Sequence, residues 1–128
     1  MLRLAGWWWI AVSLIHALVC VIQYSDQWSA IAFDGWFNVI APNPTAPIYD
    51  REDALEVYFS YTLIFLIGEL CLWVDRRQIV FPISVGIILT GTMIIGVFLI
   101  PVSGLWLALP PSIMMLSTSK SGRASNNS

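Results

Sequence analysis

A long run without charged residues constrains this chain more than any other feature. The 42 residues from Gln78 to Ser119 include no Asp, Glu, Lys or Arg. As one straight helix the run would be roughly 63 Å long, about twice the hydrocarbon thickness of a bilayer. It must therefore turn, and Pro101-Val102-Ser103-Gly104 is the break at its midpoint. The run predicts two apolar helices, over residues 79–100 and 102–117.

Proline and small residues add detail to these two helices. Pro110-Pro111 predicts a kink or a local opening within the helix over residues 102–117. In the helix over residues 79–100, Gly86 with Thr90 and Thr92 with Gly96 form two pairs spaced four residues apart. Small residues at this spacing favour close approach of a neighbouring helix in a membrane.

Two more apolar segments precede the long run, and they predict spans over residues 4–24 and 54–74. No charge occurs from Leu4 to Ser25, a stretch longer than the ~7–15-residue apolar core of a secretory signal peptide. The chain is 58% hydrophobic and 11% charged, whereas soluble domains have about 25% charged residues. This composition favours a membrane protein. It offers no Lys/Arg-rich patch for nucleic acid.

The connection between the first two spans has two parts. Residues 27–40 place apolar side chains at helical spacing, but the segment is too short to span a bilayer. This pattern predicts an amphipathic helix in the membrane interface. Residues 41–47 contain three prolines and predict an extended linker. The cluster Asp50-Arg51-Glu52-Asp53 follows, and its acids favour the start of the next helix.

The cations predict the topology. With four spans, five of the six cations fall on one side and only Arg51 falls on the other: Arg3, Arg76, Arg77, Lys120 and Arg123. The positive-inside rule then places both termini in the cytoplasm, in an inner or plasma type of membrane. The predicted fold is all-α, a four-span antiparallel transmembrane helix bundle with a short interfacial amphipathic helix in the first outer connection. It forms one domain over residues 1–119, and residues 120–128 are predicted to be a disordered polar tail.

Two polar stripes mark the faces expected to meet inside the bundle. Ser13 and His16 share one face of the first span, with Cys20 and Gln23. On the second span, one face is expected to carry Tyr58, Thr62 and Glu69, with Tyr61 beside it. An acid inside a span is rare unless packing or chemistry makes use of it, so Glu69 is expected to be sheltered by the other helices. The predicted ligand-binding seam consists of Ser13, His16, Tyr58, Tyr61, Thr62 and Glu69.

Depth along the helices limits which of these groups can meet. Glu69 is expected roughly 9 Å from the inner face and His16 roughly 18 Å, near Tyr61 and Thr62. A direct pair of Glu69 with His16 is therefore not expected. Three potential donors fall at the level of Glu69, namely Trp9, Ser84 and Ser112. Glu69 is thus interpreted either as a neutral or hydrogen-bonded structural carboxyl, or as a proton carrier, ligand anchor or general acid/base.

Metal and cofactor chemistry has little support in the sequence. His16 is the only histidine, and it is best explained as a neutral hydrogen-bonded imidazole. Cys20 and Cys71 fall near opposite ends of their spans, so no disulfide is expected and both are read as buried apolar groups. No phosphate loop, catalytic triad or dinucleotide fingerprint is present. No metal, no cofactor and no assigned catalytic residue is predicted.

Several short patterns resemble a group of small bacterial four-helix membrane proteins catalogued only as a domain of unknown function. They are Gly6 with His16 in the first span, the segment from Asp34 to Asn38, the acid-led second span with Gly68, and the segment from Pro101 to Trp106. The sequence departs from the pattern at Glu69, where such proteins often have an apolar residue. The resemblance covers most of the chain except its tail. It implies a fold and a membrane location, and it implies no activity.

Three functions remain open at this point. The favoured one is an accessory or structural membrane protein that acts through helix–helix contacts, as a homo-oligomer or within a larger membrane complex. The second is a binder or carrier of a lipophilic small molecule such as a quinone, isoprenoid or lipid, held in the seam. The third is a membrane isomerase or cyclase that uses Glu69 or His16 for proton transfer. A non-enzymatic role is favoured over an enzymatic one.

Overall fold

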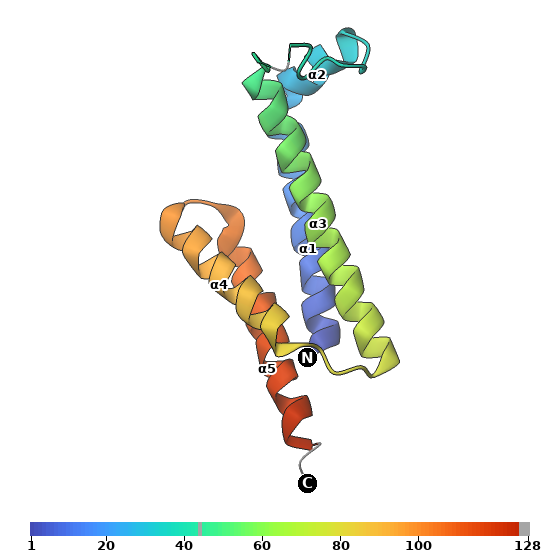
Figure 1. Ribbon diagram of the computed structural model, residues 1–128, viewed down its shortest axis with the longest axis vertical. Coiled ribbons are helices and arrows are strands. Elements are labelled where there is room, and N and C mark those ends of the chain that lie inside the picture. Colours follow the sequence, from blue (N-terminus) through green and yellow to red (C-terminus); the bar gives the residue numbers. More distant parts are fainter. Residues whose placement is uncertain (44, 126–128) are drawn as a thin grey trace. The chain divides into compact units, whose positions relative to one another are not determined.

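The computed structural model describes residues 1–43 and 45–125, with the side chains of residues 119–125 excepted. Its elements follow one another along the chain in Figure 1 as α1 (Leu2–Gln23), α2 (Ser25–Phe33), α3 (Tyr49–Arg77), α4 (Ile83–Leu99), the 3-10 helix η1 (Gly104–Ala108) and α5 (Leu109–Ser125). The described residues include no strand. The fold is therefore all-α, as predicted.

Two helices are long and apolar enough to cross a membrane, and they are α1 with 22 residues and α3 with 29. The helix α4, with 17 residues, and the segment Gly104–Thr118 are apolar but shorter. The length of α3 exceeds the predicted span of residues 54–74 at both ends. Asp50 and Glu52 occupy its first turn, and Arg76 and Arg77 its last, where each sign of charge interacts favourably with the helix dipole.

Turn-forming residues shorten two other predicted helices. The predicted interfacial helix over residues 27–40 is observed as α2, which begins at Ser25 and ends at Phe33. Gly35, Trp36 and Asn38 then adopt positive φ values of 88°, 70° and 54°, which no helix accommodates. The helix predicted over residues 79–100 begins only at Ile83, because Pro82 restricts the residue before it to extended conformations.

The predicted kink at Pro110-Pro111 is absent, and the fourth apolar segment is divided differently. Residues 104–108 form η1, and α5 starts at Leu109, so both prolines lie in its first turn. A proline there costs no hydrogen bond, because the first N–H groups of a helix have no partner inside it. The helix then continues to Ser125, through most of the predicted polar tail. Residues 126–128 of that tail, and Pro44 of the linker, lie outside the described residues.

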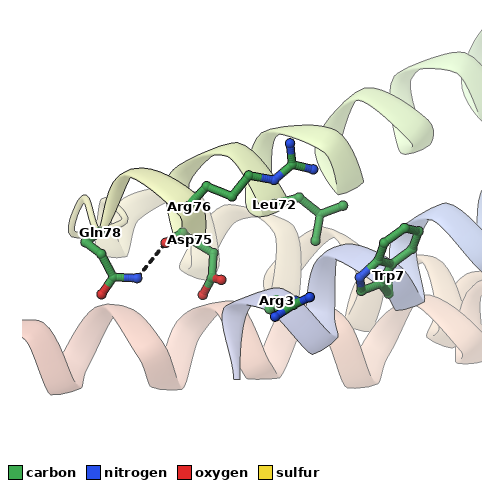
Figure 2. A pocket seen from close by; sticks show the side chains of 6 residues that line it. All are labelled: Arg3, Trp7, Leu72, Asp75, Arg76 and Gln78. Carbon is green, nitrogen blue, oxygen red and sulfur yellow. Dashed lines mark hydrogen bonds between the residues drawn. The ribbon is translucent and has the colours of Figure 1, made fainter.

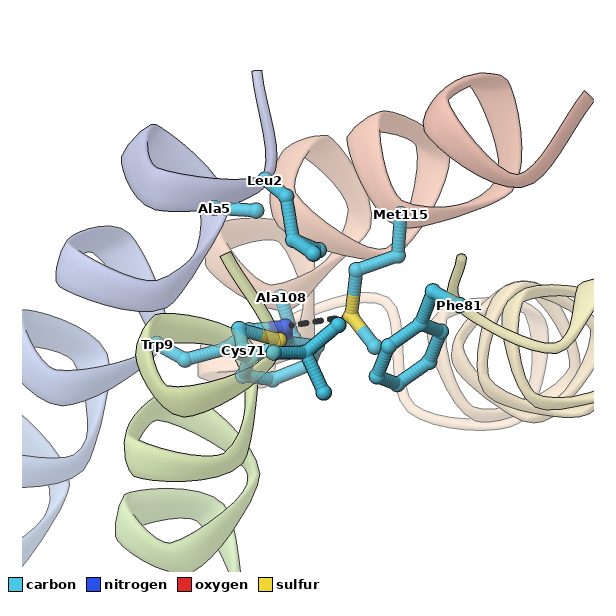
Figure 3. Packing of buried hydrophobic residues seen from close by; sticks show 8 residues of the cluster. Leu2, Ala5, Trp9, Cys71, Phe81, Ala108 and Met115 are labelled. Atoms are coloured by element: carbon cyan, nitrogen blue, oxygen red, sulfur yellow. Dashed lines mark hydrogen bonds between the residues drawn. The ribbon is translucent and has the colours of Figure 1, made fainter. Parts of the chain in front are cut away.

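The chain divides into two compact units, which are described separately. The first unit combines residues 1–12 with residues 64–128, and the second consists of residues 13–63. The buried cluster of the first unit consists of Leu2, Ala5, Trp9, Cys71, Val74, Phe81, Ala108 and Met115 (Figure 3). Trp9, with 1% of its surface exposed, directs its indole Nε1 to the Met115 sulfur at 3.2 Å.

A close approach of α4 and α5 also holds the first unit together. A Cβ atom added to Gly86 would lie 2.8 Å from the Leu116 Cα, so the two backbones touch there. This agrees with the close contact that the Gly86–Thr90 spacing predicts. At the other end of α4, a Cβ atom on Gly96 would lie 2.6 Å from the Cδ1 of Leu105, in η1.

In the second unit, Arg51 fixes the loop between α2 and α3. Its guanidinium pairs with the Asp34 carboxylate at 2.7 Å and donates a hydrogen bond to the Val39 carbonyl at 2.8 Å. The Ile48 amide donates to the Ile40 carbonyl at 3.0 Å, which closes the loop at its other end. The segment around Asp34 is thereby tied to the first turn of α3.

Candidate functional site

Three hydrogen bonds join α1 to α3 in the second unit. The Ser13 hydroxyl donates to the main-chain carbonyl of Tyr61 at 2.9 Å, and it is fully buried. The His16 Nε2 lies 3.3 Å from the hydroxyl oxygen of Ser60. The Cys20 thiol donates weakly to the Ala54 carbonyl at 3.8 Å. These contacts form the α1–α3 seam, a name used below for the polar contacts of Ser13, His16 and Cys20 with α3.

The hydrogen bonds assign a donor role to His16. The Ser60 hydroxyl donates its proton to the Val57 carbonyl at 2.7 Å, one turn earlier in its own helix. Its oxygen is then free to accept a hydrogen bond from the His16 Nε2–H. An imidazole that donates to a hydroxyl is not placed to remove that hydroxyl's proton. The hydrogen bond between His16 and Ser60 therefore links two helices, and it does not have the arrangement of a catalytic base with its nucleophile.

Aromatic rings adjoin the seam near the start of α3. Tyr58 lies edge-to-face with Tyr61, with ring centroids 4.8 Å apart and an interplanar angle of 85°. Trp28 of α2 packs against Tyr58 in the same way, at 5.7 Å and 67°. The Trp28 indole nitrogen is buried without an acceptor in hydrogen-bond geometry. It interacts with the Cys20 thiol, whose sulfur is a weak acceptor.

The structure brings together most of the predicted seam residues, with two changes. Ser13, His16, Tyr58 and Tyr61 contribute as described above, whereas the Thr62 hydroxyl donates to the Tyr58 carbonyl of its own helix at 3.3 Å. Ser60, rather than the predicted Thr62, is the neighbour of His16 on α3. Sequence reasoning missed Ser60 because, at about 100° per residue, it falls on the opposite side of the helix from the predicted polar stripe of Tyr58 and Thr62.

Glu69 does not occupy the sheltered position predicted for it. The side chain is exposed, and it forms no hydrogen bond or ion pair with any described residue. Two of its predicted donors bond elsewhere, since the Trp9 indole donates to Met115 and the Ser112 hydroxyl to the Leu109 carbonyl at 2.8 Å. The third, Ser84, is exposed. The expectation that the rest of the chain encloses this carboxyl is therefore wrong.

The contact face of α3 explains why Glu69 points outward. In the first unit, α1 approaches α3 at Gly68, where an added Cβ atom would lie 2.9 Å from the Gly6 carbonyl oxygen. The next residue of a helix is rotated by about 100°. With Gly68 directed at α1, Glu69 is therefore carried toward the edge of the contact. The predicted contact face of α3 is centred on its polar residues, whereas the observed contact with α1 is centred on Gly68.

A seven-residue spacing, occupied by small residues at every position except Tyr61, would have identified the observed contact face. Along α1, Gly6, Ser13 and Cys20 are seven residues apart, and along α3 the same spacing separates Ala54, Tyr61 and Gly68. The observed antiparallel pairs are Gly6 with Gly68 in the first unit, and Ser13 with Tyr61 and Cys20 with Ala54 in the second. A seven-residue period is the repeat expected of residues on the contact face of a helix.

Chemically, the seam offers stabilising contacts rather than an assembled catalytic group. The described residues contain no group of three or more His, Cys, Asp and Glu side chains placed to hold a metal ion. Both cysteines are buried and free. An intramolecular hydrogen bond contributes about 0.5–1.5 kcal/mol to stability, so the seam's contacts serve to fix α1 against α3.

The comparisons with known proteins confirm that the chain resembles a family of unknown function. No curated protein and no solved structure matches the chain. The match found is to a family described as "Family of unknown function (DUF6463)", and it covers residues 1–122 of the 128. The chain therefore belongs to this family of unknown function.

Proposed function

We propose that the protein is a small accessory membrane protein that acts through contacts between membrane-spanning helices, first of all with a second copy of itself. The proposal rests on a contrast between two sets of polar groups. The seam groups Ser13 and His16 find partners within the chain. Glu69 has none among the described residues and faces outward. A carboxyl in this position requires a donor from outside the chain.

The proposed topology has four spans with both termini in the cytoplasm. It is supported by the charges, because Arg3, Arg76 and Arg77 gather at the predicted inner ends of α1 and α3 and Arg51 stands at the outer end. The helix α4, at about 1.5 Å per residue, reaches roughly 26 Å, which suits a thin or locally compressed bilayer. In this topology Glu69 lies about 9 Å from the Asp75 end of α3.

The outward face of α3 has the composition of a helix-packing surface. Leu66, Leu70 and Trp73 are exposed there alongside Glu69. In a two-fold symmetric dimer whose axis is normal to the membrane, this face meets its own copy and the two Glu69 carboxyls come together. A protonated carboxyl is a donor and an ionised one is an acceptor, so two such carboxyls together share one proton in a hydrogen bond. The shared proton gives each carboxyl the partner that a single chain lacks.

Substitution of Glu69 tests the proposal. We expect Glu69→Leu to raise the dissociation constant of the dimer by about 3- to 30-fold, the loss of one hydrogen bond between membrane helices. Glu69→Gln retains a group that donates and accepts, so it is expected to keep most of the association. The measurement is the monomer–dimer distribution of the purified full chain in mild detergent, by native mass spectrometry across a dilution series.

Glu56→Leu is the matched control, since Glu56 is an exposed carboxyl near the start of the same helix. It is expected to leave the distribution unchanged. A wild-type chain that stays monomeric at every concentration, or a Glu69→Leu variant that associates like wild type, contradicts the proposal. If the chain associates only with a different membrane protein, the proposed dimer is wrong and that protein is the partner.

A second candidate function, binding of a lipophilic molecule, is favoured by one observation. The Trp28 indole N–H is buried without an acceptor in hydrogen-bond geometry, beside the Tyr58 ring at the end of the seam. The Cys20 sulfur with which it interacts is only a weak acceptor, so a stronger acceptor would lower the cost of burying this donor. A ligand carbonyl, such as that of a quinone, would satisfy this donor.

The expected result for this candidate is a ligand that depends on the indole N–H. The full chain purified in mild detergent should retain a stoichiometric lipophilic molecule, and Trp28→Phe should lower its occupancy at least severalfold while the fold is kept. Mass spectrometry of the extracted small molecules measures this. An occupancy equal in wild type and Trp28→Phe, or no retained molecule in wild type, counts against the candidate.

A further inference from the structure

A charged cavity lies in the first unit, apart from the seam and from Glu69. It has a volume of about 410 Å³ and is lined by Arg3, Trp7, Leu72, Asp75, Arg76 and Gln78. Figure 2 shows Arg3 and Trp7 on the first turns of α1, facing the end of α3 that carries Leu72, Asp75 and Arg76. Gln78 follows directly after the last residue of α3. Its volume falls within the roughly 300–1,000 Å³ that is usual for small-molecule sites.

The cations of this cavity form no ion pair with any residue that the structure describes. Among the described residues the one ion pair is that of Arg51 with Asp34, so neither Arg3 nor Arg76 is paired. Asp75 also lines the cavity, which leaves its side chains with one net positive charge. The first turn of α1 has no acidic residue, and its unpaired N–H groups add positive potential nearby.

From these observations we propose that the cavity binds the phosphate group of an anionic phospholipid such as phosphatidylglycerol. The two guanidiniums offer planar donors suited to phosphate oxygens. The Asp75 carboxylate is placed to accept from a headgroup hydroxyl, and the Trp7 indole sits where aromatic belts meet headgroups. The buried Leu72 supplies an apolar wall on which the first methylenes of an acyl chain can lie.

The lipid is favoured over free phosphate because of where the cavity lies. It opens between the N-terminal end of α1 and the C-terminal end of α3, the two helices long and apolar enough to cross a membrane. Basic groups at the ends of such helices attract anionic headgroups. The inference rests on the membrane location in the proposed function, but it does not depend on the dimer.

Native mass spectrometry of the full chain with added lipids tests the inference. Wild type is expected to retain phosphatidylglycerol about tenfold better than phosphatidylcholine of the same chains. Arg3→Gln with Arg76→Gln should abolish this preference, and each single variant should reduce it. Arg77→Gln is the matched control, because Arg77 is adjacent and equally charged, lies over the Trp73 ring at 6.0 Å and does not line the cavity.

Equal retention of the two lipids by wild type overturns the inference, and so does a loss in Arg77→Gln as large as that in the double variant. Displacement of phosphatidylglycerol by inorganic phosphate alone would overturn the lipid assignment and make this a site for soluble phosphate. The same spectra report the monomer–dimer distribution, so failure of the lipid site and failure of the Glu69 contact are read independently. Because Arg3 and Arg76 are both exposed, the variants are expected to fold. Circular dichroism of each variant checks this.

Discussion

Trp9→Ala is expected to lower the free energy of unfolding by about 3–5 kcal/mol, the usual effect of removing a fully buried tryptophan. Trp9 is the largest fully buried side chain among the described residues, with 1% of its surface exposed. It packs among residues from several helices, including Cys71 of α3, Ala108 of η1 and Met115 of α5 (Figure 3). Its loss would leave a cavity where α1, α3 and α5 meet.

Equilibrium unfolding of the purified chain in mixed micelles, followed by circular dichroism, measures this effect. Trp9→Phe keeps most of the apolar volume but loses the N–H that faces the Met115 sulfur. Its effect is expected to be less than half that of Trp9→Ala. The exposed Trp7 offers the matched control, since 55% of its surface is exposed and Trp7→Ala should cost much less. If Trp7→Ala and Trp9→Ala lowered the free energy of unfolding equally, the packing of Trp9 in the buried cluster would be contradicted.

Gly68→Ala is expected to destabilise the chain by about 1–3 kcal/mol, as overpacking of a tight contact does. The added methyl carbon would lie 2.7 Å from the Ile10 Cγ1 and 2.9 Å from the Gly6 carbonyl oxygen. The carbonyl belongs to the backbone and cannot rotate away, so α1 and α3 must separate. The reciprocal variant Gly6→Ala meets the Gly68 carbonyl at 3.0 Å and is expected to behave alike.

Gly91→Ala provides the control for this prediction. Gly91 lies inside α4, and an added Cβ atom would have no heavy atom within 4 Å. The substitution is therefore expected to be neutral, or to stabilise the helix by up to about 1 kcal/mol. The same unfolding measurement applies to both variants. If Gly68→Ala were as harmless as Gly91→Ala, the close approach of α1 and α3 would be refuted.

The order of helices could be predicted from the sequence, because charges and prolines mark most of the ends. The apolar runs are separated by the charged cluster before Ala54, by Arg76 and Arg77, and by the break after Ile100. The exact ends were harder to predict. Positive φ values at Gly35, Trp36 and Asn38 stop α2 early, and a non-glycine residue such as Trp36 gives no sequence signal for that conformation.

The site could be predicted only in part, because polarity is an incomplete marker of the inward face of a helix. The rule worked for Ser13 and His16, which bond to α3. It failed for Glu69, because in a tightly packed helix pair the smallest residue decides which face makes contact. Gly68 sets that face, and its neighbour Glu69 is turned outward. The pattern of Pro110-Pro111 misled in a similar way, since a proline pair starts a helix as readily as it kinks one.

The outward position of Glu69 is the observation on which the account of function depends. Polar groups that form hydrogen bonds within one chain stabilise that chain. An unpaired acid on an apolar helix instead favours contact with a second chain that offers a donor. The seam and the Glu69 face are therefore assigned different tasks. The first holds α1 to α3, and the second is proposed to bring two copies together.

Disulfide cross-linking in native membranes tests this claim most directly. Leu66 is exposed on α3, less than a quarter turn around the helix from Glu69, and Ile88 is exposed on α4. Oxidation of Leu66→Cys is expected to give a cross-linked dimer, Ile88→Cys should give little, and adding Glu69→Leu to Leu66→Cys should reduce the product severalfold. Equal cross-linking of Leu66→Cys and Ile88→Cys, or a yield from Leu66→Cys unaffected by Glu69→Leu, would contradict the account.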